Sequence, residues 1–277
     1  DGLIYDSRTY GIIGEVDLDV TRREDLILLN RATVKIGSSE VTAEGRLMNN
    51  KAFLLNLFIN KLDLASFQLS PASTHITGTA SLDGNFDETF NLESVAAKIL
   101  LQNDKRGDER FVRITGGVNY TEGIIEASDL LTVDLGYGVM TAQGKMNLEN
   151  ERIDVTLTTR DANLQSLAYV FGWPDSLAGQ LKGSVDLTGY LRDPSVKGIL
   201  TLSDGVFGSI TVSSLNASFL INSLIENRHG SLRAVAADGK MLGYALEKGS
   251  VDLYFRGDTV MIASVRLDGE DNYLQTS

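Results

Sequence analysis

The sequence of 277 residues contains no cysteine, which excludes disulfide bonds, cysteine-ligated zinc and thiol catalysis. Histidine is almost as scarce: His75 and His229 are the only two, and neither has metal ligands or catalytic partners at a suitable spacing. We expect both in exposed loops. No stretch approaches the roughly 20 apolar residues that a membrane-spanning helix needs. These absences predict a protein that is not an enzyme and that uses no metal and no cofactor.

Basic residues are in the minority, with 25 lysines and arginines against 37 aspartates and glutamates and a formal net charge of -12. Nucleic-acid-binding proteins carry basic stripes or patches, and the sequence shows none, so we expect no nucleic-acid partner. The hydrophobic share of 43% is sufficient for a folded chain and argues against intrinsic disorder.

Glycine is abundant, with 27 residues against 3 prolines, as expected of a chain with many tight turns. Between the turns, apolar and polar residues alternate over 12–20, 152–158, 181–188, 250–256 and 261–268. A period of two indicates strands with one dry and one wet face, and one-sided wetting indicates an antiparallel sheet. We therefore predict an all-β fold: an elongated, curled antiparallel sheet, groove-like and built of repeats, with one or two short helices.

Turn-forming residues separate the alternating runs and predict hairpin connections. They are Asn-Asn-Lys at 49–51, Asp-Gly at 83–84, 204–205 and 238–239, Glu-Asn-Glu at 149–151 and Arg-Gly-Asp at 256–258. Helical spacing of apolar residues is confined to two short segments, 62–69 and 163–171. The second precedes Pro174, where a helix would stop.

The chain also repeats itself. Residues 34–47 align without gaps on 133–146, and residues 78–84 align on 183–189, each pair lying about 100 residues apart. The order of strand, turn, strand, helical turn and glycine-ended strand occurs twice. We predict a single elongated repeat region over 1–277, with approximate repeats 1–84, 85–189 and 190–277, in which each unit contacts its neighbours.

A sheet with one apolar face must cover that face. The predicted helices are too few to do so, which leaves three alternatives: the sheet folds over on itself, packs on a partner or binds an apolar ligand. Several dry-face residues are small, and they either leave room in a trough or mark bends and bulges. These small residues are Gly14, Gly78, Ala80, Gly183 and Gly198. The candidate groove residues are Val16, Leu18, Ile76, Ala80, Leu82, Val155, Leu157, Leu181, Val185, Leu187, Leu200, Leu202, Val251 and Leu253.

Residues 177–205 read Leu-Ala-Gly-Gln-Leu-Lys-Gly-Ser-Val-Asp-Leu-Thr-Gly-Tyr-Leu-Arg-Asp-Pro-Ser-Val-Lys-Gly-Ile-Leu-Thr-Leu-Ser-Asp-Gly. This segment resembles the repeated segment of the TamB family, within the wider AsmA-like group of bacterial envelope proteins. The resemblance covers residues 163–220 most closely. It extends more loosely over 41–101, where the Pro-x-Val-x-Gly element is missing.

TamB-like proteins are anchored in the inner membrane of Gram-negative bacteria and cross the periplasm as a long curled sheet with an apolar groove. The resemblance implies that the chain is an excised fragment of such a protein, with any anchor and membrane contact outside 1–277. It implies that the groove carries phospholipid or other lipid between the two membranes, in support of outer-membrane biogenesis. It also implies an outer-membrane barrel partner of the TamA kind, reached through regions outside the fragment.

Two further hypotheses remain open at the level of sequence. The chain could be a chaperone-like scaffold that pairs its sheet edges with strands of outer-membrane proteins or autotransporters during their assembly. An extracellular adhesin-like β-solenoid would require a strict short repeat with stacked identical side chains, and no such repeat is visible.

Overall fold

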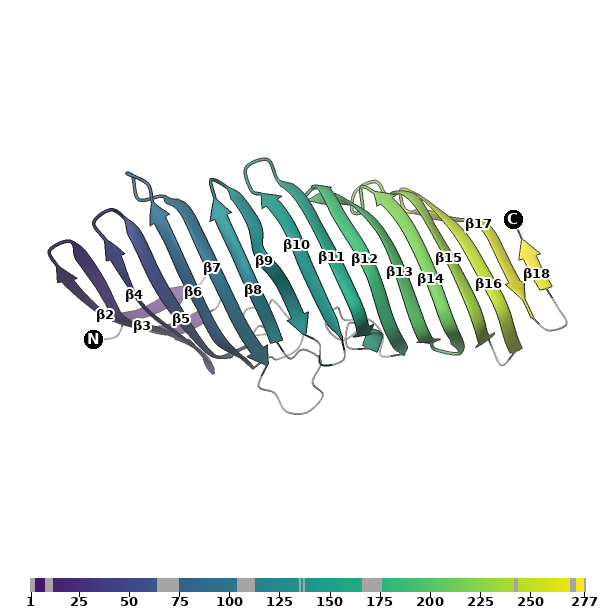
Figure 1. Ribbon diagram of the computed structural model, residues 1–277, viewed down its shortest axis with the longest axis horizontal. Coiled ribbons are helices and arrows are strands. Elements are labelled where there is room, and N and C mark those ends of the chain that lie inside the picture. Colours follow the sequence, from purple (N-terminus) through teal and green to yellow (C-terminus); the bar gives the residue numbers. More distant parts are fainter. Residues whose placement is uncertain are drawn as a thin grey trace. The chain divides into compact units, whose positions relative to one another are not determined.

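The computed structural model describes residues 3–7, 12–63, 75–103, 113–134, 136, 138–165, 176–241, 244–269 and 273–276 (Figure 1). These residues are almost all in β-strands, and the strands pair antiparallel, so the predicted all-β antiparallel class is confirmed. The chain divides into two compact units, Asp1–Val133 and Asp134–Ser277. The unit boundary falls inside the predicted repeat 85–189, and the division into three repeats stays a prediction.

Unit 1 is a meander in which each strand pairs with the next strand along the chain. Its strands are β1 (Leu3–Ser7), β2 (Ile12–Arg23), β3 (Leu26–Ile36), β4 (Ser39–Met48), β5 (Ala52–Leu62), β6 (Ile76–Phe86), β7 (Leu92–Asn103), β8 (Arg113–Thr121) and β9 (Ile124–Asp134), the last ending at the unit boundary. Most of these strands are long, and short turns join β2, β3, β4 and β5 in succession and β8 to β9.

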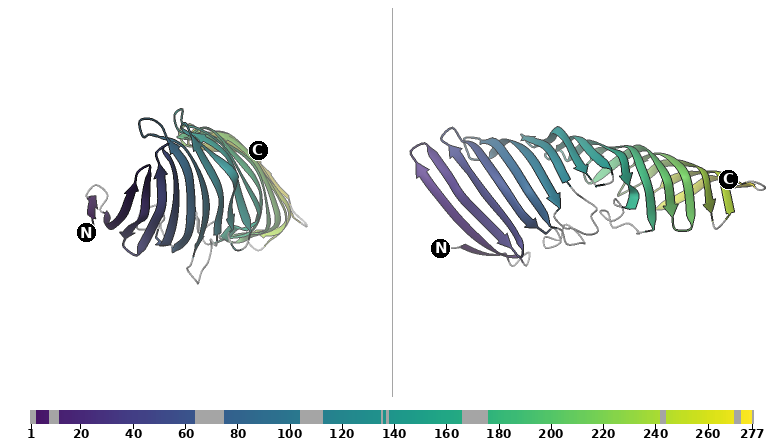
Figure 2. Two further views of the ribbon diagram at one scale, coloured as in Figure 1. Left: turned by 60° about the vertical axis from the view of Figure 1, so that its left-hand side comes forward. Right: turned by 60° about the horizontal axis from the view of Figure 1, so that its bottom comes forward.

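Unit 2 follows the same plan, again with each strand paired to its successor. Its strands are β10 (Val139–Asn147), β11 (Arg152–Asn163), β12 (Leu177–Tyr190), β13 (Asp193–Phe207), β14 (Ile210–Asn222), β15 (His229–Met241), β16 (Tyr244–Arg256), β17 (Thr259–Asp268) and β18 (Tyr273–Thr276). Its strands are bowed along their length, so the sheet of this unit is curled rather than flat (Figure 2).

The same β-bulge occurs in both units. The β5–β6 register shifts after Ile59, and the β11–β12 register shifts after Thr159. Inside each bulge one residue takes a left-handed backbone conformation, Lys61 and Asp161 each with φ of 53°. A bulge adds an unpaired residue and increases the local twist. The predicted internal similarity therefore extends to a shared irregularity of the backbone.

Three of the predicted turns are wrong. The Asp-Gly pairs at 83–84, 204–205 and 238–239 lie inside β6, β13 and β15, whereas 49–51 and 149–151 fall in turns between strands and 256–258 spans the β16–β17 turn, with Arg256 the last residue of β16. Asp204 and Asp238 take positive φ values of 52° and 47° within their strands. The left-handed conformation that Asp-Gly favours is thus used to kink a strand, where the sequence alone suggests a chain reversal.

The structure describes only part of each of the two predicted helices, 62–69 and 163–171. Leu62 is the last residue of β5, so a helix beginning there is wrong, and residues 64–69 lie outside the described residues. Asn163 ends β11, and Leu164 and Gln165 are helical, which agrees with the start of the second predicted helix. Residues 166–171 lie outside the described residues.

Candidate functional site

Directly paired residues of an antiparallel sheet share a face, so the register defines which side chains lie together. In unit 2 one such row crosses seven strands from β10 to β16 and contains no polar side chain. The row consists of Ala142, Leu157, Val185, Gly198, Phe219, Leu232 and Leu253. Its neighbours on one side are Gly144, Val155, Leu187, Val196, Ile221, Gly230 and Phe255. We call these rows and their continuation through Leu181, Leu200, Leu202 and Val251 the apolar face of unit 2.

Unit 1 presents a face of the same kind. One row consists of Val16, Val34, Val41, Ile59, Gly78, Leu101 and Ile114, and the next of Leu18, Ala32, Ala43, Leu57, Ala80, Ile99 and Gly116. A third row consists of Val20, Leu29, Gly45, Leu55, Leu82, Ala97 and Val118. These rows, with Ile76 beyond the β5–β6 bulge, form the apolar face of unit 1.

All the predicted groove residues lie on these two faces. Val16, Leu18, Ile76, Ala80 and Leu82 belong to the apolar face of unit 1. Val155, Leu157, Leu181, Val185, Leu187, Leu200, Leu202, Val251 and Leu253 belong to that of unit 2. Whether these faces bind an apolar ligand stays a prediction.

Sequence reasoning missed much of both faces. β5 contributes Phe53, Leu55, Leu57 and Ile59, and β14 contributes Leu215, Ala217, Phe219 and Ile221. The signal for both was present as a strict spacing of two. It was obscured because apolar residues also occupy the opposite face of the same strands, as at Phe58 and Leu220, which are 45% exposed each.

The apolar faces are only partly shielded. Within the described residues, apolar side chains that are fully buried are confined to Ile76, Ala162, Leu164, Val196, Leu202, Val212 and Leu246. Most other members of the two faces are half-buried, and on β2 Leu18 is 63% and Val20 47% exposed. A core between two packed layers would bury such residues almost completely. The described strands of each unit therefore form a single layer whose apolar side is shielded mainly by its own curl and neighbouring side chains.

The opposite face of unit 2 is mainly polar, although Ile199, Leu220 and Tyr254 are exposed on it. Thr156 Oγ1 donates a hydrogen bond to Asp186 Oδ1 at 2.8 Å across the β11–β12 pair. Ser264 Oγ donates to Asp252 Oδ2 at 2.8 Å across β16 and β17, where Arg233 also approaches Asp252 at 3.7 Å. The two sides of the sheet therefore differ: most hydrogen-bonding side chains lie on this face, and few lie on the apolar face.

The small residues on the apolar faces do not open a trough. A Cβ on Gly78 would lie 2.1 Å from the carbonyl oxygen of Leu100, and one on Gly198 would lie 2.5 Å from Phe219 Cζ. The space beside these glycines is filled by the neighbouring strand or by an aromatic ring. Gly78 pairs with Ile59 at the β5–β6 bulge, which agrees with the second alternative, a bend or bulge, whereas neither alternative applies at Gly198.

Asp204 on β13 and Asp238 on β15 take positive φ values inside their strands and change which side chains point to the apolar face of unit 2. Their positive φ values interrupt the alternation of β13 and β15, so that the following glycines return to the apolar side. A Cβ on Gly205 would lie 2.7 Å from Leu202 Cδ2 and 2.9 Å from Val212 Cγ2, which shows that the three residues are on one side of the sheet. Leu202 and Val212 are each 4% exposed, so this end of the face is well packed.

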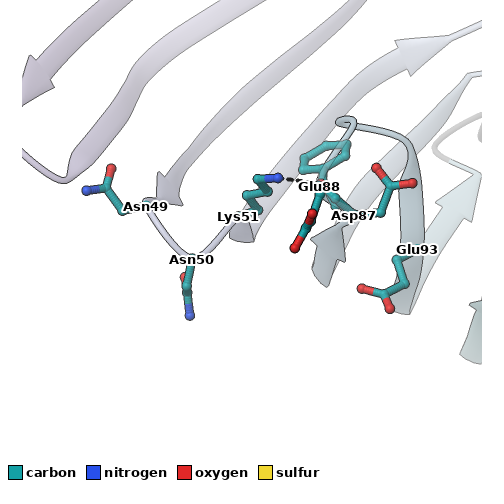
Figure 3. Close-up of a pocket in the computed structure, with 7 residues that line it drawn as sticks. Asn49, Asn50, Lys51, Asp87, Glu88 and Glu93 are labelled. Carbon is teal, nitrogen blue, oxygen red and sulfur yellow. Dashed lines mark hydrogen bonds between the residues drawn. The ribbon is translucent and has the colours of Figure 1, made fainter.

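A pocket of about 570 Å³ lies at the strand ends of unit 1, between the β4–β5 and β6–β7 turns (Figure 3). Lys51 Nζ donates to the backbone oxygen of Asp87 at 2.9 Å and lies 5.0 Å from the centre of the Phe90 ring. The lining residues are Asn49, Asn50, Lys51, Phe86, Asp87, Glu88 and Glu93. Its only cation is already engaged, so the pocket fits a turn-stabilising role better than a binding site.

The carboxylate of Asp87 organises the same turn. It accepts hydrogen bonds from the backbone amides of Asn91 at 2.8 Å and Thr89 at 2.7 Å, and from the Thr89 hydroxyl at 2.8 Å. These hydrogen bonds lower the pKa of Asp87 from 3.8 to about 2, and the bond from the Asn91 backbone amide contributes most. The shift therefore has a structural cause and does not mark an acid or base poised for chemistry.

The histidines differ from each other. His229 is exposed as predicted, with its Nδ1 at 3.1 Å from the backbone oxygen of Asn227. His75 is half-buried, so its predicted exposure is wrong, and its Nδ1 is buried without a hydrogen-bond partner in the described structure. Among the described residues, no His, Asp and Glu side chains gather in a group that could hold a metal ion.

The described part of the chain contains no helix with the length and apolarity that crossing a membrane would require. Comparison with known proteins found no matching family model, no similar curated protein and no similar solved structure.

Proposed function

We propose that the apolar faces of this chain bind the acyl chains of phospholipid or another lipid and carry lipid along the sheet. The observation that supports this is a largely apolar face on a single-layered sheet, seen in both units; in unit 2 the buried Thr159 is a polar member of that face. In unit 2 the row through Leu157, Val185 and Phe219 crosses seven neighbouring strands without a polar side chain. An extended apolar surface of this kind is a typical interaction site for an apolar ligand or partner.

The energetics favour a lipid as the ligand. Exposing an acyl chain to water costs about 0.8 kcal/mol per methylene, so two chains of ordinary length cost on the order of 20 kcal/mol. A continuous apolar surface removes much of that cost wherever the lipid lies along it. No catalytic residue is needed, and a face shaped by short aliphatic side chains holds the cargo without one deep well that would trap it.

The wider setting of the proposal comes from the resemblance of residues 163–220 to the TamB repeat. We infer that the chain is a segment of a protein that bridges the periplasm of a Gram-negative bacterium from an inner-membrane anchor. In that setting lipid would move between the inner and outer membranes. A barrel partner of the TamA kind would be met through parts of the protein beyond this segment.

Site-specific photo-crosslinking tests the proposal. A photoreactive amino acid at Val185 or Leu187, on the apolar face, is expected to capture phospholipid from vesicles of phosphatidylethanolamine and phosphatidylglycerol. The matched controls are Ser184 and Asp186, which alternate with them on β12, point to the polar face and are likewise half-buried. Equal capture at all four positions, or none at Val185 and Leu187, would contradict lipid binding by this face.

A further inference from the structure

A hollow of about 300 Å³ lies on the face of unit 1 opposite its apolar face, over strands β5, β6 and β7. Two short rows of directly paired residues supply its side chains, all of them exposed. The first row is Phe58, Thr79 and Leu100, and the second is Asn56, Ser81 and Lys98. We call the space between these side chains the β5–β7 hollow.

Two apolar side chains form opposite walls of the hollow. Phe58 is 45% and Leu100 47% exposed, although most of their neighbours on this face are polar. Both pair with Thr79, so their backbones are two strand spacings apart, about 10 Å. A gap of this width accommodates one six-membered ring in contact with both walls. An aromatic ring and an aliphatic side chain offer such a ring apolar contact.

The second row supplies free hydrogen-bonding groups. Asn56, Ser81 and Lys98 are direct neighbours, yet in the described part of the chain none of their side chains hydrogen-bonds to a protein group, and no carboxylate pairs with Lys98. On the polar face of unit 2, by contrast, Thr156 donates to its neighbour Asp186. Water satisfies the side chains of the hollow, and a ligand with hydroxyl groups can replace that water bond for bond.

We propose that the β5–β7 hollow binds one ring of an acidic sugar. The C–H groups of the ring would pack between Phe58 and Leu100. Its hydroxyl groups would exchange hydrogen bonds with Asn56 and Ser81, which can each donate and accept. Its carboxylate would lie beside Lys98, the only charged side chain of the hollow. Apolar walls with a few convergent polar groups are the usual form of a small-ligand site.

Other classes of ligand fit the hollow less well. An acyl chain would desolvate Asn56, Ser81 and Lys98 without replacing their hydrogen bonds. A nucleic acid brings a charge with every phosphate and requires several cations, whereas the hollow has one. A neutral sugar leaves Lys98 without a counter-charge. The site lies on the opposite face from the lipid-binding surface proposed above, so either function can fail without the other.

The test titrates the 277-residue chain with a tetrasaccharide of galacturonic acid and, separately, with a neutral tetrasaccharide of glucose. Binding is followed by saturation-transfer NMR and by calorimetry. We expect the acidic sugar to bind about 5-fold more tightly than the neutral one, the advantage that one exposed charge pair supplies. Because salt screens such a pair, about 0.5 M sodium chloride should remove most of that advantage.

Two variants separate the contributions of the walls and of the charge. Phe58→Ala is expected to weaken binding of both sugars about 5-fold, since it removes the aromatic contact. Lys98→Gln is expected to weaken binding of the acidic sugar by a similar factor and to leave the neutral one unchanged. The matched controls are Tyr254→Ala and Lys197→Gln, an exposed aromatic residue and an exposed lysine on the polar face of unit 2, and neither should alter binding.

Urea midpoints equal to that of the unchanged chain show that each variant keeps the fold, and Lys98→Gln alone decides the outcome if Phe58→Ala does not. Lipid capture at Val185 should be the same in both variants, which distinguishes a failure of this site from a failure of lipid binding. Absence of binding by the acidic sugar, equal affinity for the two sugars, or equal losses in the variants and their controls would each overturn the proposal.

Discussion

Gly183 on β12 lies opposite Leu200 on β13, and a Cβ added to Gly183 would lie 2.2 Å from the carbonyl oxygen of the preceding residue, Ile199. The φ of Gly183 is +154°, a conformation that residues with a side chain rarely adopt. Gly78 on β6 occupies the equivalent place in unit 1, with φ of +153° and a Cβ contact of 2.1 Å. Both glycines pair with the residue that precedes the shared bulge, so the bulge and the glycine form one structural device.

Replacing Gly183 by alanine is therefore expected to destabilise unit 2. The strained backbone alone costs about 1–3 kcal/mol, and the contact with the Ile199 oxygen adds to it. The measurement is urea unfolding followed by circular dichroism. Gly249→Ala is the control, since its φ is ordinary and its Cβ would meet only the ends of flexible side chains, Leu267 Cδ2 at 3.3 Å and Leu246 Cδ2 at 3.5 Å. If both variants unfold at the same urea concentration, the close approach at Gly183 is not a constraint.

Phe219 is expected to contribute more to stability than its neighbour Leu220. Its ring lies over Gly198, where a Cβ would be 2.5 Å from the Phe219 Cζ, so the ring supplies the apolar surface that the glycine lacks. Truncation of this half-buried ring by Phe219→Ala should cost about 2 kcal/mol. Leu220→Ala, on the opposite face of the same strand, should change the free energy of unfolding by less than about 0.5 kcal/mol. Similar losses for the two variants, measured by urea unfolding, would contradict this reading of the face.

The turn held by Asp87 predicts a dependence of stability on acid. The pKa of this carboxyl is lowered to about 2 in the folded chain, below its ordinary 3.8. A lowered folded-state pKa gives stability that is present above the unfolded-state pKa and is lost as the pH falls from about 4 towards 2. Asp87→Asn should remove part of the wild-type loss over that interval, measured by urea midpoints at each pH. Glu88→Gln, which removes one charge from the same turn, is expected to retain it.

The alternation of apolar and polar residues was sufficient to predict the all-β antiparallel class and, for the five runs in which it is clear, the strand and its apolar side. This succeeded because a period of two has one structural meaning wherever one face of a sheet is dry. It failed at Asp204 and Asp238, since an Asp-Gly pair has the same local preference in a turn and in a kinked strand. Only the strands on either side decide which of the two forms, and their pairing cannot be seen in a short window of sequence.

The solvent exposure of residues on the apolar faces could not be predicted from the sequence. Periodicity shows that Leu18 and Leu202 are on apolar faces, but not that the first is 63% and the second 4% exposed. That difference depends on what lies beside each residue in three dimensions. Leu18 lies beyond Val16, the last residue of β2 that is registered against a described residue of β1, whereas Leu202 is packed by Val212 and by the side chains around the kink at Asp204.

The exposure of Leu18 allows lipid binding by unit 1 to be tested apart from its stability. Leu18→Arg places a charge on the apolar face at a residue that is 63% exposed, so the folded chain should be little affected. Acyl chains would meet a charge that must be desolvated, and lipid capture near it should fall several-fold. Asp17→Arg is the control, because Asp17 precedes Leu18 on the opposite face of β2 and is also exposed. The measurement is transfer of a fluorescent phospholipid from vesicles to each variant, with urea midpoints recorded alongside. Equal transfer by both variants would remove β2 from the lipid-binding surface, whereas a selective loss with Leu18→Arg would extend that surface to the edge of unit 1.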